Sequence, residues 1–368
     1  MNYLITGGCG FIGVNLIRRL MDGDEAHRIR VIDNLTVGTR EDLAAVCDYS
    51  ERRVQSVECK PPGAMRHALC ELVVGDVRDP GLALKVAQGM DCIVHLAANT
   101  GVMPSIEDPR GDCEVNVIGT FNYLEAARQN GGKKFILASS GAPLGEQLPP
   151  INEEKVPKPI SPYGASKLAG EGYCSAFFGS FGLNTTALRF GNVYGPLSTH
   201  KGSVVARFIK QALEGEILII YGDGTQTRDF IYIDDLIDAI LAAAGCDLGG
   251  EVFQIATHKE TTVNEIAELL KTIIESKTGN VVKLSYADAR AGEVLRNFSD
   301  ISKAKGLLGW EPKWSVEEGL EATVEWFLGA ESRAQSGGRI GHSAESRAQR
   351  VRRREGRGQR AEDGGQSG

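Results

Sequence analysis

Hydrophobic, β-branched residues recur in short runs through the first half of the chain. Between these runs, apolar positions recur every three or four residues. The first pattern predicts buried β-strands, and the second predicts amphipathic helices that cover a sheet. Because the two alternate, the strands should lie parallel and be joined by helical crossovers. The expected strands are residues 2–6, 29–33, 71–75, 91–97, 134–139 and 184–190.

Helical spacing is clearest in residues 11–22, 107–129 and 162–181. Together with the strands it predicts an α/β protein with a Rossmann-type, doubly wound parallel sheet over residues 1–188. After Arg189 the pattern becomes less regular. Residues 189–329 should form mainly a smaller C-terminal substrate-binding lobe, with some segments returning to the first domain. The helices expected there are 203–214, 262–277 and 315–328.

Two stretches fit neither part of this organisation. Residues 48–70 interrupt what should be a short link between a helix and a strand, so we expect a surface insertion there. From residue 330 onward the chain repeats Ala-Glu-Ser-Arg-Ala-Gln and becomes rich in Arg, Gly and Gln. With almost no apolar residues, 330–368 is predicted to be a disordered tail.

The composition suits a globular enzyme: the chain has 368 residues, 42% of them hydrophobic, and a formal net charge of −7. This charge argues against nucleic-acid binding. No apolar run is long enough to span a bilayer and no signal peptide opens the chain, so we expect a cytoplasmic protein without membrane contact. The eight scattered cysteines suit reduced thiols. Cys47, Cys59, His67 and Cys70 match no familiar zinc spacing, so no metal site is predicted.

Glycines stand at positions 7, 10 and 13, directly after the first expected strand and at the start of the first expected helix. There Gly7 permits a tight bend, Gly10 lets a pyrophosphate approach the backbone, and Gly13 lets helix and strand pack closely. The helix N-terminus, with Phe11 and Ile12, would face the phosphates. This context predicts a dinucleotide site, and a glycine turn without a ligand is the plainer alternative.

Acidic and small residues end the following strands at the same edge of the sheet. Asp33 comes about twenty residues after the glycine turn, where a carboxylate accepts hydrogen bonds from an adenosine ribose and repels a 2′-phosphate. NAD is therefore favoured over NADP, unless Asp33 only forms a turn. Asp76 would meet the adenine amino group. The other expected NAD contacts are Asn34, Val77, Leu96, Ala97 and Ala98.

Tyr163 and Lys167 stand four residues apart at the start of a predicted helix. This spacing places them on one helix face. An ammonium beside a phenol, with the positive nicotinamide of NAD nearby, favours the phenolate and lowers the pKa of the tyrosine. Tyr163 would then take a proton from a hydroxyl group. Ser140, after the fifth expected strand, adds a hydroxyl where a substrate oxygen would lie.

A series of short motifs runs along the chain in a recognisable order. They are Gly7-x-x-Gly10-x-x-Gly13, Asp33-Asn34-Leu35, Gly75-Asp76-Val77-Arg78-Asp79, His95-Leu96-Ala97-Ala98, Ser139-Ser140, Tyr163-x-x-x-Lys167, Arg189-Phe190-Gly191-Asn192-Val193-Tyr194-Gly195 and Gly222-Asp223-Gly224-x-x-x-Arg228-Asp229. Together they closely resemble the NAD-dependent epimerase/dehydratase family of extended short-chain dehydrogenases/reductases, which includes the UDP-glucose 4-epimerases. The resemblance extends to about residue 328, apart from 48–70.

This resemblance implies an isomerase with bound NAD. The implied reaction is the 4-epimerisation of UDP-glucose and UDP-galactose, or of a UDP-N-acetylhexosamine, through a transient 4-keto intermediate. Ser140 and Tyr163 match the residues that handle the proton of the sugar 4-hydroxyl group. Tyr163 and Lys167 also match cofactor contacts, and the lysine would hold the nicotinamide ribose. The family likeness further implies a homodimer.

The resemblance also implies how a nucleotide-diphosphate sugar, in the first place a UDP-sugar, would be held. Asn192 matches an asparagine on the phosphates. Arg228 and Arg290 match arginines that clamp the diphosphate, a role that suits guanidinium groups because they donate forked hydrogen bonds. Tyr221 matches an aromatic residue near the uracil base, and a packing role for it stays equally open.

Two departures from the family pattern bear on the reaction. Ser140 is followed by Gly141-Ala142-Pro143-Leu144-Gly145, without the usual Val-Tyr-Gly. Dehydratases and decarboxylases of the family carry Asp and Glu directly after the catalytic Thr or Ser, because elimination needs an additional acid and base. Gly141 and Ala142 therefore favour an epimerase over a lyase. Met103, where relatives that act on uronic acids often carry arginine, makes a carboxylated sugar less favoured.

A non-catalytic sensor of NAD is a more remote alternative, because such members of the superfamily typically lose the tyrosine or the lysine.

One residue of the chain bears on which sugar the site would accept. Asn297 is the seventh residue after Arg290. In the epimerases that the chain resembles, this position lines the pocket near the sugar C2 substituent, and an asparagine would leave room for an N-acetyl group. The alternative is a side chain that faces solvent.

Overall fold

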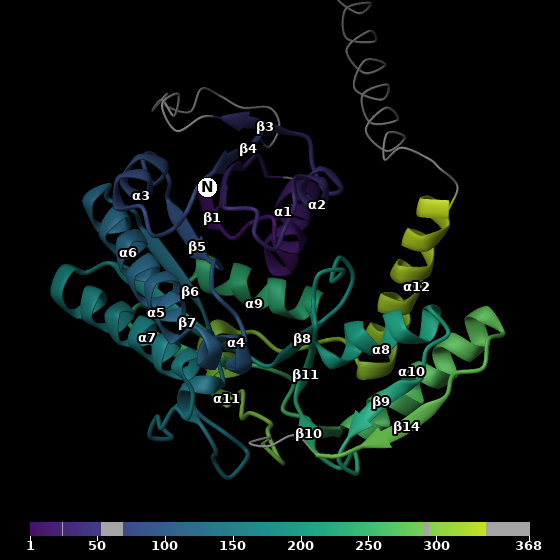
Figure 1. The fold of residues 1–368 in the computed structure, drawn as a ribbon. Helices are drawn as coiled ribbons and strands as arrows, with labels where there is room; N and C mark the ends of the chain where they lie inside the picture. The colour runs from purple at the N-terminus through teal and green to yellow at the C-terminus, as the bar shows by residue number, and fades with distance from the viewer. Residues whose placement is uncertain (24, 53–68, 290–293, 336–368) are drawn as a thin grey trace, which may run out of the picture. The chain divides into compact units, whose positions relative to one another are not determined.

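An eight-stranded parallel sheet forms the centre of the fold in the computed structural model, which describes residues 1–23, 25–52, 69–289 and 294–335 (Figure 1). The strand order is β12-β7-β6-β5-β1-β2-β4-β3, and every pair is parallel. The strands are β1 (Asn2–Thr6), β2 (Arg28–Asp33), β3 (Tyr49–Arg52), β4 (Leu69–Val74), β5 (Cys92–His95), β6 (Lys134–Ser140), β7 (Asn184–Phe190) and β12 (Glu251–Ile255).

The order of the strands reverses at β1, which lies between β2 and β5. Ile5 of β1 pairs with Val31 on one side and with Val94 on the other. All three side chains are fully buried, as expected for parallel strands that are covered on both faces. In an open α/β sheet, the crevice at such a reversal is where ligands bind, beyond the carboxyl ends of the strands.

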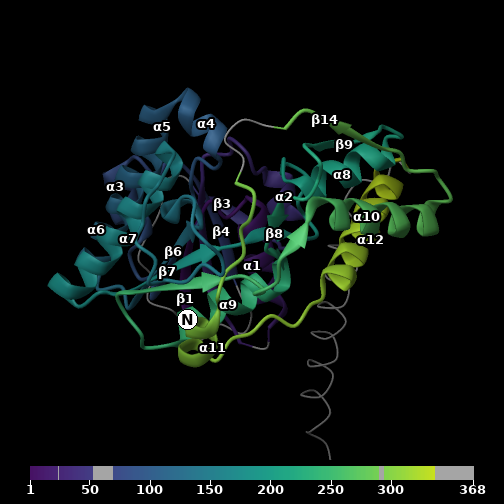
Figure 2. The same ribbon diagram turned by 90° about the horizontal axis from the view of Figure 1, so that it is seen from below.

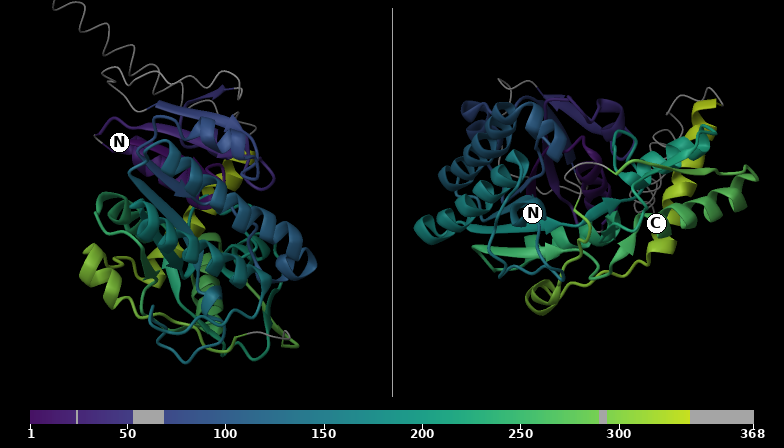
Figure 3. Two further views of the ribbon diagram at one scale, coloured as in Figure 1. Left: turned by 90° about the vertical axis from the view of Figure 1, so that its left-hand side faces the viewer. Right: turned by 60° about the horizontal axis from the view of Figure 1, so that its bottom comes forward.

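Helices cover both faces of the sheet, as the sequence predicted. One layer holds α1 (Phe11–Asp22) and α9 (Ile233–Gly245), which pack together. The other holds α3 (Pro80–Val86), α6 (Gly119–Gln129) and α7 (Pro162–Phe181). Figures 1 to 3 show the sheet between these two layers. The predicted Rossmann-type, doubly wound fold is thus confirmed.

The second half of the chain adds short strand pairs and further helices. The pairs are β8 (Asn192–Tyr194) with β11 (Phe230–Tyr232), β9 (Leu218–Tyr221) with β14 (Leu284–Ala287), and β10 (Thr227–Arg228) with β13 (Thr261–Thr262). The helices are α8 (Val204–Leu213), α10 (Val263–Thr278), α11 (Ser302–Leu308) and α12 (Val316–Gln335). The smaller lobe seen beside the sheet in Figure 2 comprises β9, β14, α8 and α10, whereas α9 and β12 return to the sheet.

Both ends of the segment 48–70, where a surface insertion was expected, belong to strands of the sheet. Tyr49–Arg52 forms β3, the edge strand of the sheet, and Leu69 already opens β4. The strand was missed because its residues are mostly polar and exposed, which an edge strand tolerates and a buried strand does not. Residues 53–68 lie outside the described part of the chain.

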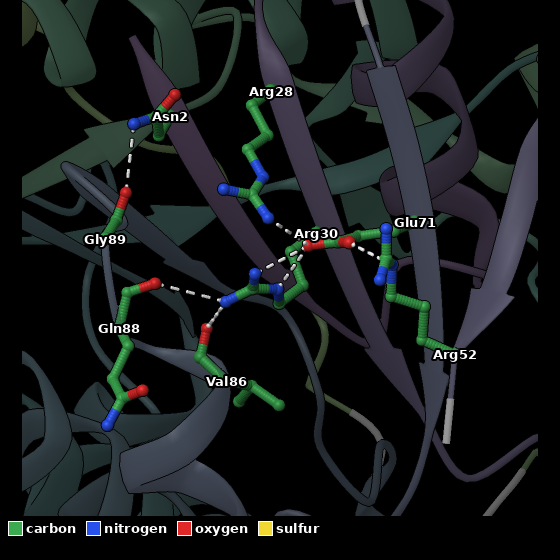
Figure 4. A network of polar contacts seen from close by, with 8 residues as sticks. All are labelled: Asn2, Arg28, Arg30, Arg52, Glu71, Val86, Gln88 and Gly89. Carbon is green, nitrogen blue, oxygen red and sulfur yellow. Dashed lines mark hydrogen bonds and ion pairs between the residues drawn. The ribbon is translucent and has the colours of Figure 1, made fainter. Parts of the chain in front are cut away.

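A buried ion cluster ties β3 to the interior of the sheet (Figure 4). The Glu71 carboxylate of β4 accepts a hydrogen bond of 2.6 Å from Arg30 Nε and also pairs with Arg28 at 3.2 Å and Arg52 at 2.8 Å. Arg30 is 1% exposed and donates a further hydrogen bond of 2.6 Å to the Val86 carbonyl. Glu71 therefore supplies negative charge beside a guanidinium group that the sheet buries.

Two other boundaries differ from the expectation. Instead of one helix over 107–129, the chain forms α4 (Val102–Glu107), α5 (Pro109–Cys113), a π-helical turn (Glu114–Ile118) and α6. The break falls at Asp108, because Pro109 cannot donate to the preceding turn and the Asp108 carboxylate caps Gly111 N at 2.9 Å.

At the C-terminal end, α12 continues to Gln335, past the residue at which the tail was expected to begin. Residues 1–325 form one compact unit, and Trp326–Gln335, the described part of a second unit, is the end of this helix. The rest of the expected tail, 336–368, lies outside the described residues. No helix in the described ranges is both long and apolar enough to span a membrane.

We predict that Glu71→Ala lowers the free energy of unfolding by about 3–5 kcal/mol, because it removes the carboxylate that pairs with the buried Arg30 guanidinium. The matched control is Glu51→Ala, which breaks the pair with Arg40 at 2.8 Å on the exposed side of the same sheet edge. That loss should stay below about 1 kcal/mol. Urea unfolding measures both values, and equal losses would contradict the proposed importance of the buried cluster.

Candidate active site

A cavity of about 610 Å³ opens at the carboxyl ends of the central strands, where the strand order reverses. It joins the two groups of residues that the sequence singled out separately. Its lining includes the predicted cofactor residues Gly7, Gly10, Phe11, Ile12, Gly13, Asp33, Asn34, Asp76, Val77, Leu96, Ala97 and Ala98, together with Ser140, Tyr163, Lys167 and Asn192.

At the glycine turn, the backbone packs too closely against other backbone segments for side chains to fit. Gly7 has φ +66°, and a Cβ atom on it would lie 2.8 Å from Ala97 N. A Cβ on Gly13 would lie 2.5 Å from Gly8 Cα. The backbone therefore comes close to the neighbouring strand, and α1 begins at Phe11 with its unpaired N–H groups at the cavity. These features fit the pyrophosphate of NAD.

Asp33 holds the glycine turn and the next loop in place. Its Oδ2 accepts a hydrogen bond of 2.9 Å from Cys9 N, and its Oδ1 accepts one of 2.8 Å from Leu35 N. Burial raises the pKa of this carboxyl group, while the two backbone donors act against the shift. Each oxygen keeps acceptor capacity that a ribose hydroxyl group can use.

Asp76 also lines the cavity, but its carboxylate is already engaged. Arg78 donates to it from Nε at 3.0 Å and from Nη2 at 2.8 Å. These hydrogen bonds hold the pKa of Asp76 below its usual value. Its contact with adenine stays a prediction, and an approaching amino group would have to share the oxygens with Arg78.

Ser140, Tyr163 and Lys167 meet where β6 ends and α7 begins. Ser161 caps α7 by accepting a hydrogen bond of 3.1 Å from Gly164 N, which directs Tyr163 towards the end of β6. Ser140 Oγ accepts a hydrogen bond of 3.2 Å from Ala142 N and lies near enough to the Tyr163 hydroxyl group to lower its pKa. One turn later, the Lys167 ammonium donates to the Ala138 carbonyl at 2.8 Å and lies 5.9 Å from the centre of the Tyr163 ring.

The expected lowering of the tyrosine pKa invoked both Lys167 and the positive nicotinamide of NAD, and the structure shows the contribution of the chain. Burial raises the pKa of Tyr163, and the hydrogen bond with Ser140 only partly opposes this. The residues of the chain by themselves thus do not produce the lowered tyrosine pKa that the motif suggested. Burial lowers the pKa of Lys167 to about 8, although Asp112 and Glu171 act in the opposite direction. The lysine therefore keeps its charge at neutral pH.

Buried polar contacts fix the helix that carries the tyrosine and the lysine. Glu171 accepts a hydrogen bond of 2.6 Å from Ser139 Oγ and a bidentate pair from Arg189 at 2.8 and 2.7 Å. Asn116 donates to Ser166 Oγ at 3.1 Å, and Ser166 donates to the Tyr163 carbonyl at 3.0 Å. The sequence analysis missed these supporting residues, since nothing in their spacing shows which polar side chains the fold buries together.

The residues expected at the nucleotide sugar are more scattered. Asn192 lines the cavity, whereas Tyr221, Arg228 and Asn297 are not among the described residues that do so. Arg228 donates to the carbonyls of Thr227 and Val294, both at 2.7 Å. Arg290 lies outside the described residues.

Tyr221 and Asn297 each have a definite neighbour. The Arg207 guanidinium lies 5.5 Å from the centre of the Tyr221 ring. The Asn297 amide nitrogen lies 4.0 Å from the position that a Cβ atom would take on Gly141. Asn297 is therefore next to the turn that follows Ser140, which the spacing from Arg290 alone could not reveal.

Lys201 and His200 also line the cavity, and the sequence analysis missed both. The Lys201 ammonium lies 4.8 Å from the centre of the Phe11 ring, and the His200 Nε2 atom lies 3.1 Å from the Asp42 carboxylate. Both follow the Tyr194-Gly195 end of a recognised motif, in an irregular loop without periodicity to indicate a role. Within the described ranges, no group of three His, Cys, Asp or Glu side chains is arranged to hold a metal ion. Cys59 and His67 lie outside those ranges.

Comparisons with known proteins agree with this geometry. The model of the NAD dependent epimerase/dehydratase family matches residues 3–256. A putative UDP-glucose 4-epimerase of Methanocaldococcus jannaschii is 35% identical, over 88% of this chain and 97% of that protein. The crystal structure of UDP-glucose 4-epimerase from Thermotoga maritima with UDP-glucose gives a TM-score of 0.78 at 37% identity, covering 90% of this chain and 99% of that one.

A relative with a different activity matches at a similar level. The dTDP-glucose 4,6-dehydratase 1 of Escherichia coli is 32% identical, over 89% of this chain and 93% of that protein. Epimerases and dehydratases thus share the fold and the cofactor, and the residues at the site must decide between them. With its glycine turn, its Tyr163 and Lys167 pair and these matches, the chain belongs to the NAD-dependent epimerase/dehydratase family.

Proposed function

We propose that this NAD-dependent enzyme is a 4-epimerase of UDP-sugars. One observation carries the proposal. The glycine turn of a dinucleotide site lines the same cavity as Ser140, Tyr163 and Lys167. A sugar held above the nicotinamide would have its 4-hydroxyl group within reach of Tyr163 and Ser140. The nucleotide would extend towards Asn192.

The residues of the chain supply proton transfer and charge. Tyr163 takes the proton of the 4-hydroxyl group, and Ser140 holds the same oxygen by a hydrogen bond. The buried Lys167 ammonium stabilises negative charge on the tyrosine oxygen. Bound NAD would supply reversible hydride transfer at C4. Return of the hydride to the opposite face of the transient 4-keto sugar, and of the proton from Tyr163 to its oxygen, would give the epimer. Since substrate and product have the same oxidation state, no further redox partner is required.

A lyase is the second candidate, because dehydratases are among the relatives. Elimination needs an acid and a base beyond the tyrosine. The acidic residues among the described lining are Asp33, Asp42 and Asp76, and all of them follow β2 or β4. Asp33 at the end of β2 is separated by three strand spacings, on the order of 14 Å, from Ser140 at the end of β6. The absence of a nearby carboxylate in this lining favours epimerisation.

A non-catalytic NAD sensor has no need for a proton-transfer group. Here the tyrosine, the serine and the lysine are all present and in contact with the same cavity. The helix cap and the buried hydrogen bonds that position these side chains would not be needed in a protein that only binds the cofactor. This arrangement favours the enzyme.

Tyr163→Phe should lower turnover of a UDP-hexose by at least ~10²-fold, because the ring stays while the general base is lost. NAD content should be unchanged. The matched control is Tyr286→Phe on β14, whose parent side chain is 58% exposed and is not among the residues that line the cavity. Activity near that of the parent enzyme in Tyr163→Phe would refute the role of this tyrosine.

The sugar specificity is proposed to include N-acetylated sugars. Asn297 is half-buried beside the Gly141 turn that follows Ser140. An amide of this size leaves space near the sugar C2 substituent and can hydrogen-bond an acetamido group. UDP-N-acetylglucosamine should then be accepted as well as UDP-glucose.

Replacing Asn297 with Tyr should reduce kcat/KM for UDP-N-acetylglucosamine at least ~10-fold more than for UDP-glucose, because the added ring fills the space for the acetamido group. Asn297→Ala, which adds no bulk, serves as the control and should retain both substrates. Parallel losses on the two sugars in the tyrosine variant, or no activity of the parent on the acetylated sugar, would exclude this pocket.

The homodimer is proposed from an exposed aromatic surface on α6 and α7. Phe121 and Tyr173 pack edge to face with ring centres 5.3 Å apart, yet they remain 36% and 40% exposed. Phe181, at the end of α7, is 55% exposed. Contiguous exposed rings on two neighbouring helices are typical of an interface between protein chains.

Light scattering coupled to gel filtration should give the mass of two chains for the parent protein. Phe121→Asp should shift the mass to that of one chain, since a carboxylate in the centre of such an interface would be desolvated without a partner. Tyr286→Asp, at an aromatic residue that is 58% exposed on β14, should remain dimeric. A monomeric parent protein would rule out the dimer.

A further inference from the structure

The loop between β8 and α8 brings a lysine over the start of the cofactor helix. Lys201 lines the cavity, and its ammonium lies 4.8 Å from the centre of the ring of Phe11, the first residue of α1. It also donates a hydrogen bond of 2.8 Å to the Val193 carbonyl, next to Asn192. The positive charge thus lies between the glycine turn and the strand that carries the expected phosphate ligand Asn192.

Within the described part of the chain, this charge has no anionic partner. Val193 O is the hydrogen-bond acceptor of Lys201, and no carboxylate forms an ion pair with it among the described residues. Burial is the single cause that lowers its pKa, to about 8. An ammonium group has three donors, so it can still donate to a ligand oxygen. A cation that is desolvated at a cavity wall without a counterion is stabilised when an anion binds there.

The loop is anchored on both sides of the lysine, so its place is defined. His200 pairs with Asp42 of α2 (Arg40–Ala44) at 3.1 Å. Ser198 donates a hydrogen bond of 2.7 Å to the Gly195 carbonyl, and the Lys201 N–H donates to the Ser198 carbonyl at 3.1 Å. On the α8 side, Lys210 donates to the Thr199 carbonyl. These contacts orient the ammonium without neutralising it.

The facing surface is suited to the same kind of ligand. The N–H groups of the first turn of α1 are available to phosphate oxygens, and the partial positive charge of a helix N-terminus favours an anion. Asn192, one residue from the Val193 carbonyl, adds an amide that can donate. Two independent features, an unpaired ammonium and a helix N-terminus, therefore converge on one part of the cavity.

We propose that Lys201 is a diphosphate-binding residue that contacts the phosphate oxygens of a nucleotide in this cavity. The diphosphate could belong to NAD or to the nucleotide sugar, and both carry the same chemistry. The nucleotide-sugar source rests on the proposed function, whereas the NAD source rests only on membership of the family. The residue acts by charge and hydrogen bonding and takes no part in proton transfer.

The test compares Lys201→Met, which keeps much of the aliphatic stem, with Lys201→Arg, which keeps the charge. Lys303→Met is the matched control, because it removes a lysine of α11 that also donates to a backbone carbonyl and lies over an aromatic ring but does not line the cavity. Two quantities are measured for each protein as purified: NAD retained per chain after exhaustive dialysis, and the dissociation constants of UDP and uridine by calorimetry.

Lys201→Met should weaken binding of UDP, or retention of NAD, by about 10-fold or more, which is the size expected for a charge-assisted hydrogen bond. Lys201→Arg should recover most of the loss, and uridine affinity should not change. Weakened UDP binding assigns the contact to the nucleotide sugar, and weakened NAD retention assigns it to the cofactor.

The inference is overturned if UDP and NAD both bind Lys201→Met as they bind the parent protein. It is also overturned if uridine is lost to the same extent as UDP, or if Lys303→Met reproduces the effect. Failure of the proposed function has a different signature: the parent protein would not epimerise UDP-sugars, while the NAD measurement would still decide whether Lys201 binds a diphosphate.

Discussion

The site depends on the close approach of backbone to backbone at the point where the strand order reverses. Gly7, with φ +66°, lies so near β5 and its following loop that a Cβ atom would be 2.8 Å from Ala97 N. Gly13 is equally constrained against Gly8. This packing lets α1 begin at the sheet edge with its N–H groups facing the cavity. A side chain at either glycine would push α1 away from the sheet.

Four buried cations of the chain differ in whether a carboxylate pairs with them. Arg30 and Arg189 are nearly inaccessible, and each has a carboxylate partner, Glu71 and Glu171 respectively. Lys167 and Lys201 line the cavity and form no ion pair with a carboxylate among the described residues. Burial lowers the pKa of each of these lysines to about 8. Of these four cations, the two that pair with a carboxylate support the fold, whereas the two that line the cavity stay open to a ligand.

The spacing of Tyr163 and Lys167 determines where their side chains lie, but not whether the pKa of the tyrosine suits proton transfer. The spacing of Tyr163 and Lys167 places them on one helix face, and the structure brings Ser140 to the same place. Burial nevertheless raises the pKa of the tyrosine. The proposed mechanism requires this tyrosine to lose its proton near neutral pH, so a lowering of its pKa would have to come from the positive nicotinamide or from the substrate complex. The chain prepares the geometry, and the bound cofactor completes the electrostatics.

The amino-acid sequence determined the alternating strands and helices, the Rossmann-type sheet, the family and the cofactor, because these depend on local periodicity and on glycines at fixed offsets. It could not reveal β3, whose polar residues pair with β4 through backbone hydrogen bonds and a distant glutamate. Nor could it show that Asn297 reaches the Gly141 turn or that Lys201 reaches Phe11. Only the tertiary structure decided these contacts, because they join segments far apart in sequence and depend on loop geometry that no local pattern specifies.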